Sequence, residues 1–360
     1  MINNPTCIRL LLISSVLLAG ITSAATPLSS PFVLSSTNQP EKNSVCRDAP
    51  PPIIKLSITS KYGDDGPQRD TLDAAAEAEE TSQMAPLRSY SQAVVKMANA
   101  YIRTGDPAPA RCALTWLSAW AGAGALAQMD DHNAQFQRAA VLAGLSLAML
   151  QIRPAVSADP RYGAVALWMR RSIAATMANF DATSSLKGSR NNHLYWVGLA
   201  AASVAVVNND RTMLTWAAST YQQAVCGANS AGGLPLELSR GAMARNYHLF
   251  ALNALVPLAV LLQGNGIDAF AECDGALGRI VNFSLVAIDD PAAITALAGK
   301  AQHPLPGGVP GATQVAFIEA YQRYAQGPIP QLARLLALRP LTSTNLGGDQ
   351  TLLYGRQTTR

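Results

Sequence analysis

The sequence predicts an all-α fold, and within that class an (α/α) toroid, an incomplete barrel of antiparallel helix hairpins. Three observations predict it. Ten segments repeat apolar residues at i, i+3 and i+4, strand-type alternation is scarce, and short turn signals separate the segments. In addition, 49% of the 360 residues are hydrophobic and 14% are charged. The helices therefore carry apolar residues on more than one face and need two packed layers to bury them. A compact helix bundle is the alternative.

Two segments precede the helices. Residues 1–24 are typical of a secretory signal peptide, because Arg9 is followed by an apolar run at 10–18 and by small residues at 22–24. We therefore expect a periplasmic or secreted protein. The apolar run is too short for a membrane span, and we expect no span elsewhere in the chain. Residues 25–56, rich in Pro, Ser and Thr, predict an extended lead-in.

The helices are expected within one domain, residues 57–350, which a tail at 351–360 follows. Residues 60–83 predict a lid loop that ends in a short acidic helix, because they are polar and begin with glycines. From about residue 86 the helical pattern takes over. The predicted helices cover residues 87–103, 108–128, 133–150, 164–180, 192–207, 212–226, 242–262, 267–286, 312–324 and 329–337. Gly, Pro or Asn signals lie between most of them.

Four cysteines remain once the signal peptide is removed: Cys46, Cys112, Cys226 and Cys273. An even number in an exported chain favours disulfides, and four cysteines allow three sets of pairings. Their spacing lacks the close pairs of a zinc site, so we expect no metal. The formal net charge of +4 is too weak and too dispersed to predict a nucleic-acid partner, whereas an acidic ligand is compatible with it.

The first motif is Asn191-Asn192-His193 at the predicted start of an apolar helix. Asn191 suits the N-cap, and Asn192 would then point elsewhere, free to donate its amide to a ligand. His193 lies near the positive end of the helix dipole, which disfavours the imidazolium. It is therefore expected to be neutral and able to accept a proton. A half-buried structural histidine is the alternative.

The second motif places Arg240 seven residues before Tyr247. If the segment is helical, seven residues make nearly two turns, so both side chains share one face about 10 Å apart along the axis. The structural alternatives are an ion pair of Arg240 with Glu237 and a core position for Tyr247. His248 points about 100° away from Tyr247 and is expected to be structural or to support the site.

Together these residues form a set without a carboxylate pair or a metal cluster. Such a set suits proton removal beside an anionic carboxylate better than hydrolysis, because a glycoside hydrolase needs two carboxylates across its cleft. Glu237 is the only acid in either motif. Trp116, Trp120 and Trp196 lie at helical spacing and are expected in the core, although one or two could stack on a sugar ring.

These motifs, with others in the same order, resemble the alginate lyases of polysaccharide lyase family 5. The others are Ser60-Lys61-Tyr62, the segments at 112–121 and 234–240, and Leu346-Gly347-Gly348, so the likeness spans about residues 56–350. The resemblance implies an exported, metal-independent (α/α) toroid without a cofactor. Departures at 63–66 and 291–311 leave the substrate preference and the binding subsites open.

The resemblance also implies roles for individual residues. Asn192, His193 and Arg240 match the residues that bind and neutralise the uronate carboxylate, and Tyr247 matches the catalytic tyrosine.

Other residues match the surroundings of that site. Lys61 matches the lysine of the lid loop, and Cys46 with Cys112 match a disulfide that would tether the lead-in. We expect further substrate contacts from neighbours in the same motifs: Tyr62, Asn191, Tyr195, Trp196 and His248.

The expected activity is β-elimination of 4-linked polyuronate, above all polymannuronate, to leave 4,5-unsaturated uronate ends. Tyr247 would remove H5 and then protonate O4, which share one face in mannuronate and in glucuronate. A nearby cation would lower the pKa of the Tyr247 phenol and favour the phenolate. Asn192, His193 and Arg240 would stabilise the charge that develops on the carboxylate.

Two alternatives stay open at this point. One is a polyglucuronate lyase with the same mechanism, and the other is a non-catalytic periplasmic polysaccharide-binding or scaffold protein. In each case the expected partner is an anionic polysaccharide, and we expect a monomer.

Overall fold

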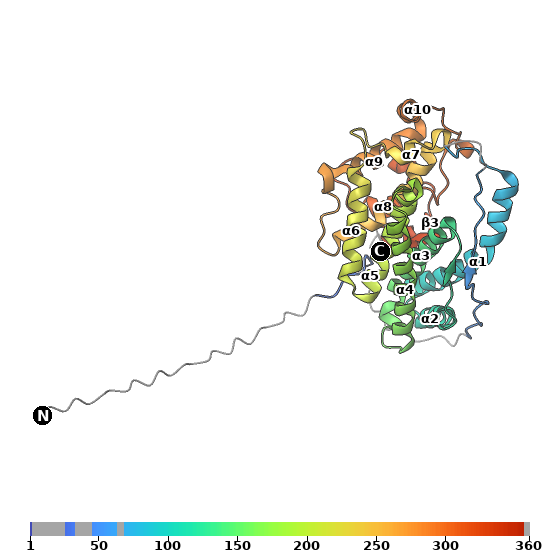
Figure 1. Ribbon diagram of the computed structural model, residues 1–360, viewed down its shortest axis with the longest axis vertical. Helices are drawn as coiled ribbons and strands as arrows, with labels where there is room; N and C mark the ends of the chain where they lie inside the picture. Colours follow the sequence, from blue (N-terminus) through green and yellow to red (C-terminus); the bar gives the residue numbers. More distant parts are fainter. Residues whose placement is uncertain (2–25, 33–44, 63–67, 356–360) are drawn as a thin grey trace.

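The computed structural model describes residue 1 and residues 26–32, 45–62 and 68–355 (Figure 1). Residues 2–24 of the predicted signal peptide, residues 25 and 33–44 of the predicted lead-in, residues 63–67 of the predicted lid loop and residues 356–360 of the tail lie outside the described residues.

Four consecutive helix pairs make up the body. They are α1 (Ala74–Thr104) with α2 (Pro107–Gly122), α3 (His132–Val156) with α4 (Arg161–Ala182), α5 (Asn192–Asn208) with α6 (Arg211–Cys226), and α8 (Ala244–Gln263) with α9 (Glu272–Asp289). The first members α1, α3, α5 and α8 pack on one another in that order and form an inner row. The second members lie outside them, with α2 against α4 and α6 against α9. This arrangement confirms the predicted (α/α) toroid.

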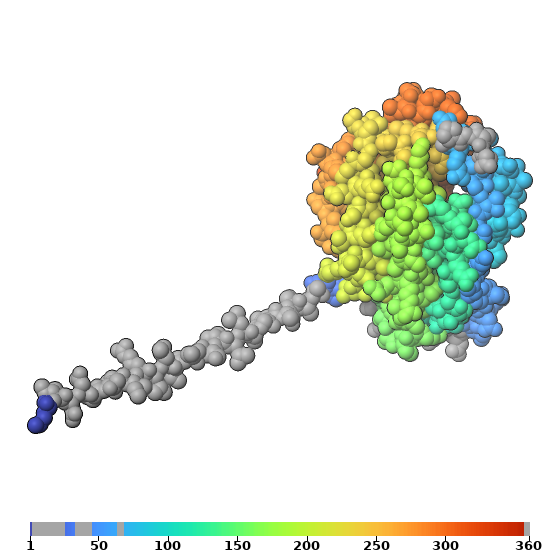
Figure 2. Space-filling model, viewed as in Figure 1, coloured from blue at the N-terminus to red at the C-terminus, as the bar shows by residue number. Residues whose placement is uncertain are grey.

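Two of the inner helices, α5 and α8, carry apolar residues on every side along the stretches where they are buried all round. Every residue of α5 from Leu194 to Val207 is buried, as is every residue of α8 from Ala251 to Leu262. In Figure 1, α3, α5 and α8 lie in the middle of the body, with α1 and α6 at its sides. Figure 2 shows how the side chains of the green and yellow segments close over this face. The buried apolar area of this row is the main stabilising term of the fold.

Two of these helices are also long and apolar enough to cross a membrane, namely His132–Val156 and Gly241–Gln263, and a third span follows if the bent pair Glu272–Asp289 and Ala292–Ala298 is counted. The expectation that no stretch would meet this criterion is therefore wrong. The apolar stretches of the two helices are 83% and 78% buried inside the protein, so their hydrophobicity serves the core.

Helix boundaries differ from the prediction where loops pack against other elements. Helix α1 begins at Ala74, capped by the Asp73 side chain, and continues through Pro86, so it absorbs the predicted short acidic helix. Helix α2 ends at Gly122 because the chain then turns to form β2 (Gln128–Met129), which pairs in parallel with β1 (Lys55–Leu56).

The C-terminal third is less helical than predicted. The predicted helices at 312–324 and 329–337 shrink to α11 (Ile318–Tyr321) and α12 (Leu332–Leu336), and α10 (Ala292–Ala298) was not predicted. The remaining elements are short: η1 (Lys187–Ser189), α7 (Pro235–Leu238), η2 (Gly241–Met243), η3 (Pro306–Gly308), β3 (Thr342–Ser343), η4 (Thr344–Leu346), β4 (Gly348–Asp349) and α13 (Gln350–Tyr354). Strands β3 and β4 pair antiparallel.

The lead-in is fastened to α2 by tryptophans. Trp116 Nε1 donates to the carbonyl oxygen of Arg47 (2.7 Å), and Trp120 Nε1 donates to that of Pro50 (3.0 Å). Trp120 also stacks on Tyr90 with ring centroids 3.5 Å apart. Both indoles are therefore structural, and neither lines the cavity described below.

One pair of cysteines forms a bridge that the sequence left undecided, whereas the pair implied by the resemblance does not. Cys226 and Cys273 form a disulfide that joins the end of α6 to the start of α9. Cys46 and Cys112 are free thiols, so the predicted disulfide between them is wrong for this structure. Burial, together with a hydrogen bond to Cys46, raises the pKa of the Cys112 thiol to about 12. Such a thiol gives little of the thiolate from which disulfides form.

Candidate active site

A cavity of about 560 Å³, here called the Tyr247 cavity, opens where the N-terminal ends of α5 and α8 meet α1, α3 and the segment before α1. Polar and aromatic side chains predominate in its wall. Residues of both sequence motifs reach it, as do residues that lie far from them in the sequence: Lys61, Tyr62, Arg69, Arg88, His132, Phe136, Asn191, His193, Trp196, Arg240, Tyr247 and Phe250.

The charge of the cavity wall is one-sided. Five cationic side chains line it: Lys61, Arg69, Arg88, Lys187 and Arg240. Within the described residues that line it, Glu80 supplies the one carboxylate. A wall of this kind attracts an anionic ligand. It lacks the facing carboxylate pair of a glycoside hydrolase.

Arg240 and Tyr247 lie against each other. The guanidinium is 3.7 Å from the centre of the Tyr247 ring and 4.8 Å from that of Tyr62, close enough for cation–π attraction to both. Its Nε donates to the carbonyl oxygen of Gln68 (2.9 Å), and its Nη2 donates to that of Arg69 (2.6 Å). The two tyrosine hydroxyls share a short hydrogen bond.

Arg240 and Tyr247 lie together as predicted, but the predicted reason, one helix that carries both residues, does not hold. Arg240 precedes a turn, η2 (Gly241–Met243), and α8 begins only at Ala244, so no single helix carries both Arg240 and Tyr247. The turn folds the guanidinium directly over the phenol ring, which is closer than two helical turns would allow. The predicted ion pair of Arg240 with Glu237 is not among the ion pairs of the described residues.

The protonation state of Tyr247 differs from the prediction. Burial, and then the neighbouring Tyr62 hydroxyl, raise the pKa of the Tyr247 phenol well above its usual value, whereas Arg240 acts in the opposite direction and is outweighed. The expectation that the nearby cation gives Tyr247 a lowered pKa is therefore wrong for the free protein. Tyr247 is a neutral phenol there.

His193 is neutral as predicted, although for a different main reason. Burial lowers the pKa of its imidazole to about 3, and His132, Arg240 and Arg69 lower it further. The ring stacks on Phe136 with centroids 4.0 Å apart, and its Nδ1 lies 3.5 Å from Nε2 of His132. At neutral pH the His193 imidazole therefore keeps a lone pair for a proton or a ligand hydrogen bond.

The asparagine pair divides between capping and internal support. Asn191 is the N-cap of α5, and its Oδ1 accepts from the His193 backbone N–H (3.0 Å), as predicted. Asn192 is fully buried; its backbone N–H donates to Glu237 Oε1 (2.7 Å) and its Nδ2 donates to Oε2 (2.8 Å). The prediction that the Asn192 amide is free for a ligand is therefore wrong.

Glu237 is the residue that joins the two motifs. Both of its carboxylate oxygens hold Asn192 at the start of α5, while its own segment leads directly to Arg240. Burial raises the pKa of the Glu237 carboxyl to about 7, against hydrogen bonds from Asn192 and the charge of Arg240 that lower it. Asn192 Oδ1 has no hydrogen-bond partner in the described part of the chain.

Two further predicted contacts lie behind the cavity wall. Tyr195 is buried and does not line the cavity. His248 is buried too: its Nε2 accepts from the Leu234 backbone N–H (2.9 Å), and its Nδ1 donates to the Ala244 carbonyl oxygen (2.8 Å). Burial lowers the pKa of His248 to about 4. Both residues are structural, which corrects their assignment to substrate binding and agrees with the predicted orientation of His248.

Trp196, Lys61 and Tyr62 do line the cavity. Trp196 packs on Phe250, and its buried Nε1 has no hydrogen-bond partner among the described residues. Lys61 Nζ lies 5.7 Å from the centre of the Tyr62 ring.

The sequence reasoning missed four residues of the wall: Arg69, Arg88, His132 and Phe136. His132 and Phe136 begin α3, and His132 is 61 positions from His193. Asp131 marks that helix start as an N-cap, but no local pattern links it to the Asn191–His193 motif. Arg69 belongs to a stretch that the sequence marks only as polar, and Arg88 lies in a predicted helix whose apolar spacing gives no sign of a ligand site.

Comparison with known proteins adds independent information. Residues 35–294 match the family model described as Alginate lyase. A polysaccharide lyase of Stenotrophomonas maltophilia (strain K279a) is 31% identical over 314 residues, which cover 86% of this chain and 90% of that protein. An alginate lyase of Pseudomonas aeruginosa (strain PAO1) is 31% identical, with 87% and 86% covered.

Solved structures agree with the fold. The alginate lyase A1-III from Sphingomonas species A1 superposes with a TM-score of 0.69 at 23% identity, covering 87% of this chain and 88% of that one. A form of A1-III complexed with tetrasaccharide gives a TM-score of 0.71 at 24% identity, with the same coverage. At these identities the likeness concerns the fold.

Proposed function

Since the chain belongs to the alginate lyase family, we propose that it cleaves 4-linked polyuronate by β-elimination and that polymannuronate is its preferred substrate. The protein is an enzyme, a polysaccharide lyase that acts on alginate. The preference for mannuronate and the roles of individual residues are the parts that need testing.

One observation carries the mechanism. Arg240, Tyr247 and His193 converge in a cavity lined by five cations and by a single described carboxylate. Elimination at a uronate needs these elements: positive charge where the carboxylate sits, a group that removes H5, and a donor for O4 of the leaving sugar. A hydrolase would instead need two carboxylates that face each other.

The carboxylate is the centre of the reaction. H5 is weakly acidic while the neighbouring carboxylate bears its full charge, so a donor that stabilises the enolate-like charge lowers the barrier. Arg240 is the strongest such donor beside Tyr247, and Lys61 and Arg69 add positive charge. Asn192 has an indirect role in this scheme, because its amide is used to hold Glu237.

Tyr247 supplies the proton chemistry. As a neutral phenol it can give its proton to O4 of the leaving sugar, and the phenolate that this leaves, which Arg240 favours, takes H5 and restores the phenol. H5 and O4 lie on the same face of mannuronate and of glucuronate, so one phenol can serve both atoms. These two sugars should therefore both be cleaved, with O2 and O3 contacts deciding the preference.

A second candidate substrate, polyguluronate, rests on His193. In guluronate H5 and O4 lie on opposite faces, so a second group would have to act as base. His193 lines the cavity and is neutral, as a base requires. We rank this candidate lower because burial lowers the pKa of His193 to about 3, which makes its imidazole a weak base.

Parallel assays on polymannuronate, polyglucuronate and polyguluronate, followed by the absorbance of the unsaturated uronate, test the proposal. We expect the fastest cleavage with polymannuronate, some with polyglucuronate and little with polyguluronate. A clear preference for polyguluronate would overturn both the substrate and the single-tyrosine mechanism. Absence of the absorbance with all three polymers would favour a binding protein.

We also propose that the enzyme is exported to the periplasm or secreted, and that it acts as a monomer. The sequence of residues 1–24 supports export, and the N-terminal sequence of the mature protein tests it. Sedimentation of the purified enzyme tests the oligomeric state.

A further inference from the structure

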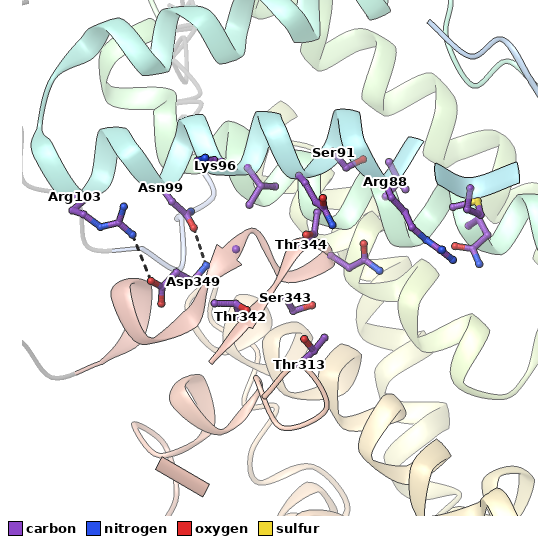
Figure 3. Close-up of a pocket in the computed structure, with 17 residues that line it drawn as sticks. Arg88, Ser91, Lys96, Asn99, Arg103, Thr313, Thr342, Ser343, Thr344 and Asp349 are labelled. Carbon is purple, nitrogen blue, oxygen red and sulfur yellow. Dashed lines mark hydrogen bonds and ion pairs between the residues drawn. The ribbon is translucent and has the colours of Figure 1, made fainter. Parts of the chain in front are cut away.

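A second cavity of about 650 Å³, here called the α1 cavity, lies along helix α1. Its opposite wall is the C-terminal segment that contains β3, η4 and β4 (Figure 3). Figure 3 shows Arg88, Lys96, Asn99 and Arg103 along the helix, with Thr342, Ser343 and Thr344 on the facing segment.

The α1 cavity and the Tyr247 cavity are adjacent. Five residues line both of them: Arg88, Gln137, Thr313, Ser343 and Asn345. Arg88 therefore lies at the boundary between the two cavities.

Cations follow α1 along this cavity. Lys96 and Arg103 are seven positions apart, which places them on the same side of the helix about 10 Å apart, and Arg88 lies about 12 Å before Lys96, roughly 80° further round the helix. Such intervals are comparable to the length of two linked pyranose rings. A 4-linked uronate carries one carboxylate per ring, so its charges recur at a spacing that this row can match.

Of these three cations Lys96 is available to a ligand. Arg88 lies 4.0 Å from Glu80, and Arg103 lies 3.6 Å from Asp349, the one carboxylate in the described wall of the α1 cavity. Lys96 is exposed and has no ion pair or hydrogen bond among residues 26–32, 45–62 and 68–355.

The wall opposite Lys96 is preformed. Asn99 Nδ2 donates to the carbonyl oxygen of Gly347 (2.9 Å), and its Oδ1 accepts from the Asp349 backbone N–H (2.8 Å). Gly348 has a φ of 107°, and a Cβ there would collide with the Asn99 side chain. The C-terminal segment is thus fixed to α1 before any ligand binds, so filling this cavity requires little ordering of the protein.

From this adjacency and these charges we propose that the α1 cavity is a further part of the substrate cleft. It holds additional uronate residues of the chain whose scissile bond lies at Tyr247, and Lys96 pairs with one of their carboxylates. This proposal rests on the proposed polyuronate lyase function. It assigns Lys96 a role in the preference for long chains, away from the reacting atoms.

The test compares Lys96→Gln with Arg171→Gln. Both changes remove one exposed positive charge, but Arg171 lies on α4 and lines neither cavity. We expect Lys96→Gln to lower kcat/KM on polymannuronate about fivefold, with a clearly smaller loss on the shortest oligomannuronate that the enzyme cleaves. Arg171→Gln should match the wild type on both substrates, and the melting temperatures should all agree.

A binding measurement separates this proposal from the lyase function. Calorimetric titration of Tyr247→Phe with oligomannuronates of increasing length should show affinity that rises with length. The rise should diminish when Lys96→Gln is added, and it should diminish in the same way at high salt. An equal loss at every length, or no loss at any length, would overturn the proposal. A wild-type enzyme without the unsaturated product would overturn the lyase function alone, because the titration does not require turnover.

Discussion

The floor and the roof of the Tyr247 cavity are held in different ways. The floor, residues 191–196 and 234–250, is joined by hydrogen bonds between fully buried groups, such as Asn192 with Glu237 and Leu234 with His248. The roof, residues 58–62 and 68–72, is held by Arg240 and by an ion pair between Asp70 and Lys300, whose side chains are 12% and 48% exposed.

This difference indicates what each region can do. A buried hydrogen bond is costly to break, because the groups that lose it stay out of contact with water. An exposed ion pair contributes little and is screened by salt. The floor therefore holds the catalytic groups in fixed positions, and we expect the contact between Asp70 and Lys300 in the roof to loosen at a lower cost in free energy.

Removal of the Tyr247 hydroxyl tests the catalytic role of this residue, which belongs to the floor. Tyr247→Phe should lower kcat by about 10³-fold, because the variant can neither remove H5 nor protonate O4. Oligomannuronate affinity should stay within a few-fold of the wild type, since the ring still packs under Arg240. Retention of more than about a tenth of the wild-type rate would shift the proton chemistry to His193.

Substitution of Arg240 tests the hydrogen bonds that join the floor to the roof. Arg240→Lys should lower kcat/KM about 10²-fold, because an ammonium group cannot donate to two carbonyls and lie flat over Tyr247 at once. Arg171→Lys, on the outer helix α4, is the matched control and should change neither constant. Equal kinetics for both variants would mean that charge alone matters at this position.

Substitution of Glu237 tests the hydrogen bonds that join the two segments of the floor. Glu237→Leu leaves two Asn192 donors buried without an acceptor, at about 1–3 kcal/mol each, so the melting temperature and kcat should both fall. Glu237→Gln should cost much less, because Asn192 can rotate its amide and let the unpartnered Oδ1 accept from the new amide.

The same residue predicts a pH effect. Burial raises the pKa of Glu237 from its ordinary value of 4.5 to about 7 in the folded protein, so the folded state binds the proton more tightly. Its contribution to stability is complete below about pH 4.5 and is lost as the pH rises through 7. Thermal unfolding between pH 5 and 7 should show this decline in the wild type and less of it in Glu237→Gln. Identical slopes would remove Glu237 as its source.

The smallest effect is expected from the roof. Lys300→Ala breaks the ion pair with Asp70, which also accepts from the Ala242 backbone N–H, and should change KM on polymannuronate by less than about threefold. The Lys300 hydrogen bond lowers the pKa of Asp70, so its small stabilisation is present above pH 4 and disappears at lower pH. A loss as large as that of Arg240→Lys would contradict the view of a loosely held roof.

Sequence reasoning reached the parts of this site that local chemistry determines. Asn191 caps a helix because its side chain can bond to a backbone amide two residues on. The position of His193 at the start of that helix follows from the cap. The sequence could not show that Asn192 turns inward, because its acceptor Glu237 lies 45 residues away. The same limit hid His132, which meets His193 only in the folded protein.

The same distinction, between what local sequence determines and what contacts between distant segments determine, applies to the fold. Long helices with apolar residues on several faces were predictable, since periodicity alone shows them. The short helices after residue 290 were not, because packing against α8 and α9 decides where they begin and end. The pKa of Tyr247 was misjudged because the sequence shows the neighbouring cation but not the burial of the phenol, which is the larger influence.

The disulfide between Cys226 and Cys273 has a consequence for the unfolded chain. It closes a loop of 47 residues, and both Arg240 and Tyr247 lie within that loop. Closing a loop of this length removes chain entropy from the unfolded state and favours folding by about 4 kcal/mol in the simplest polymer estimate. The segment that carries Arg240 and Tyr247 is thus confined to a covalent ring even before it folds. A reducing environment would open that ring.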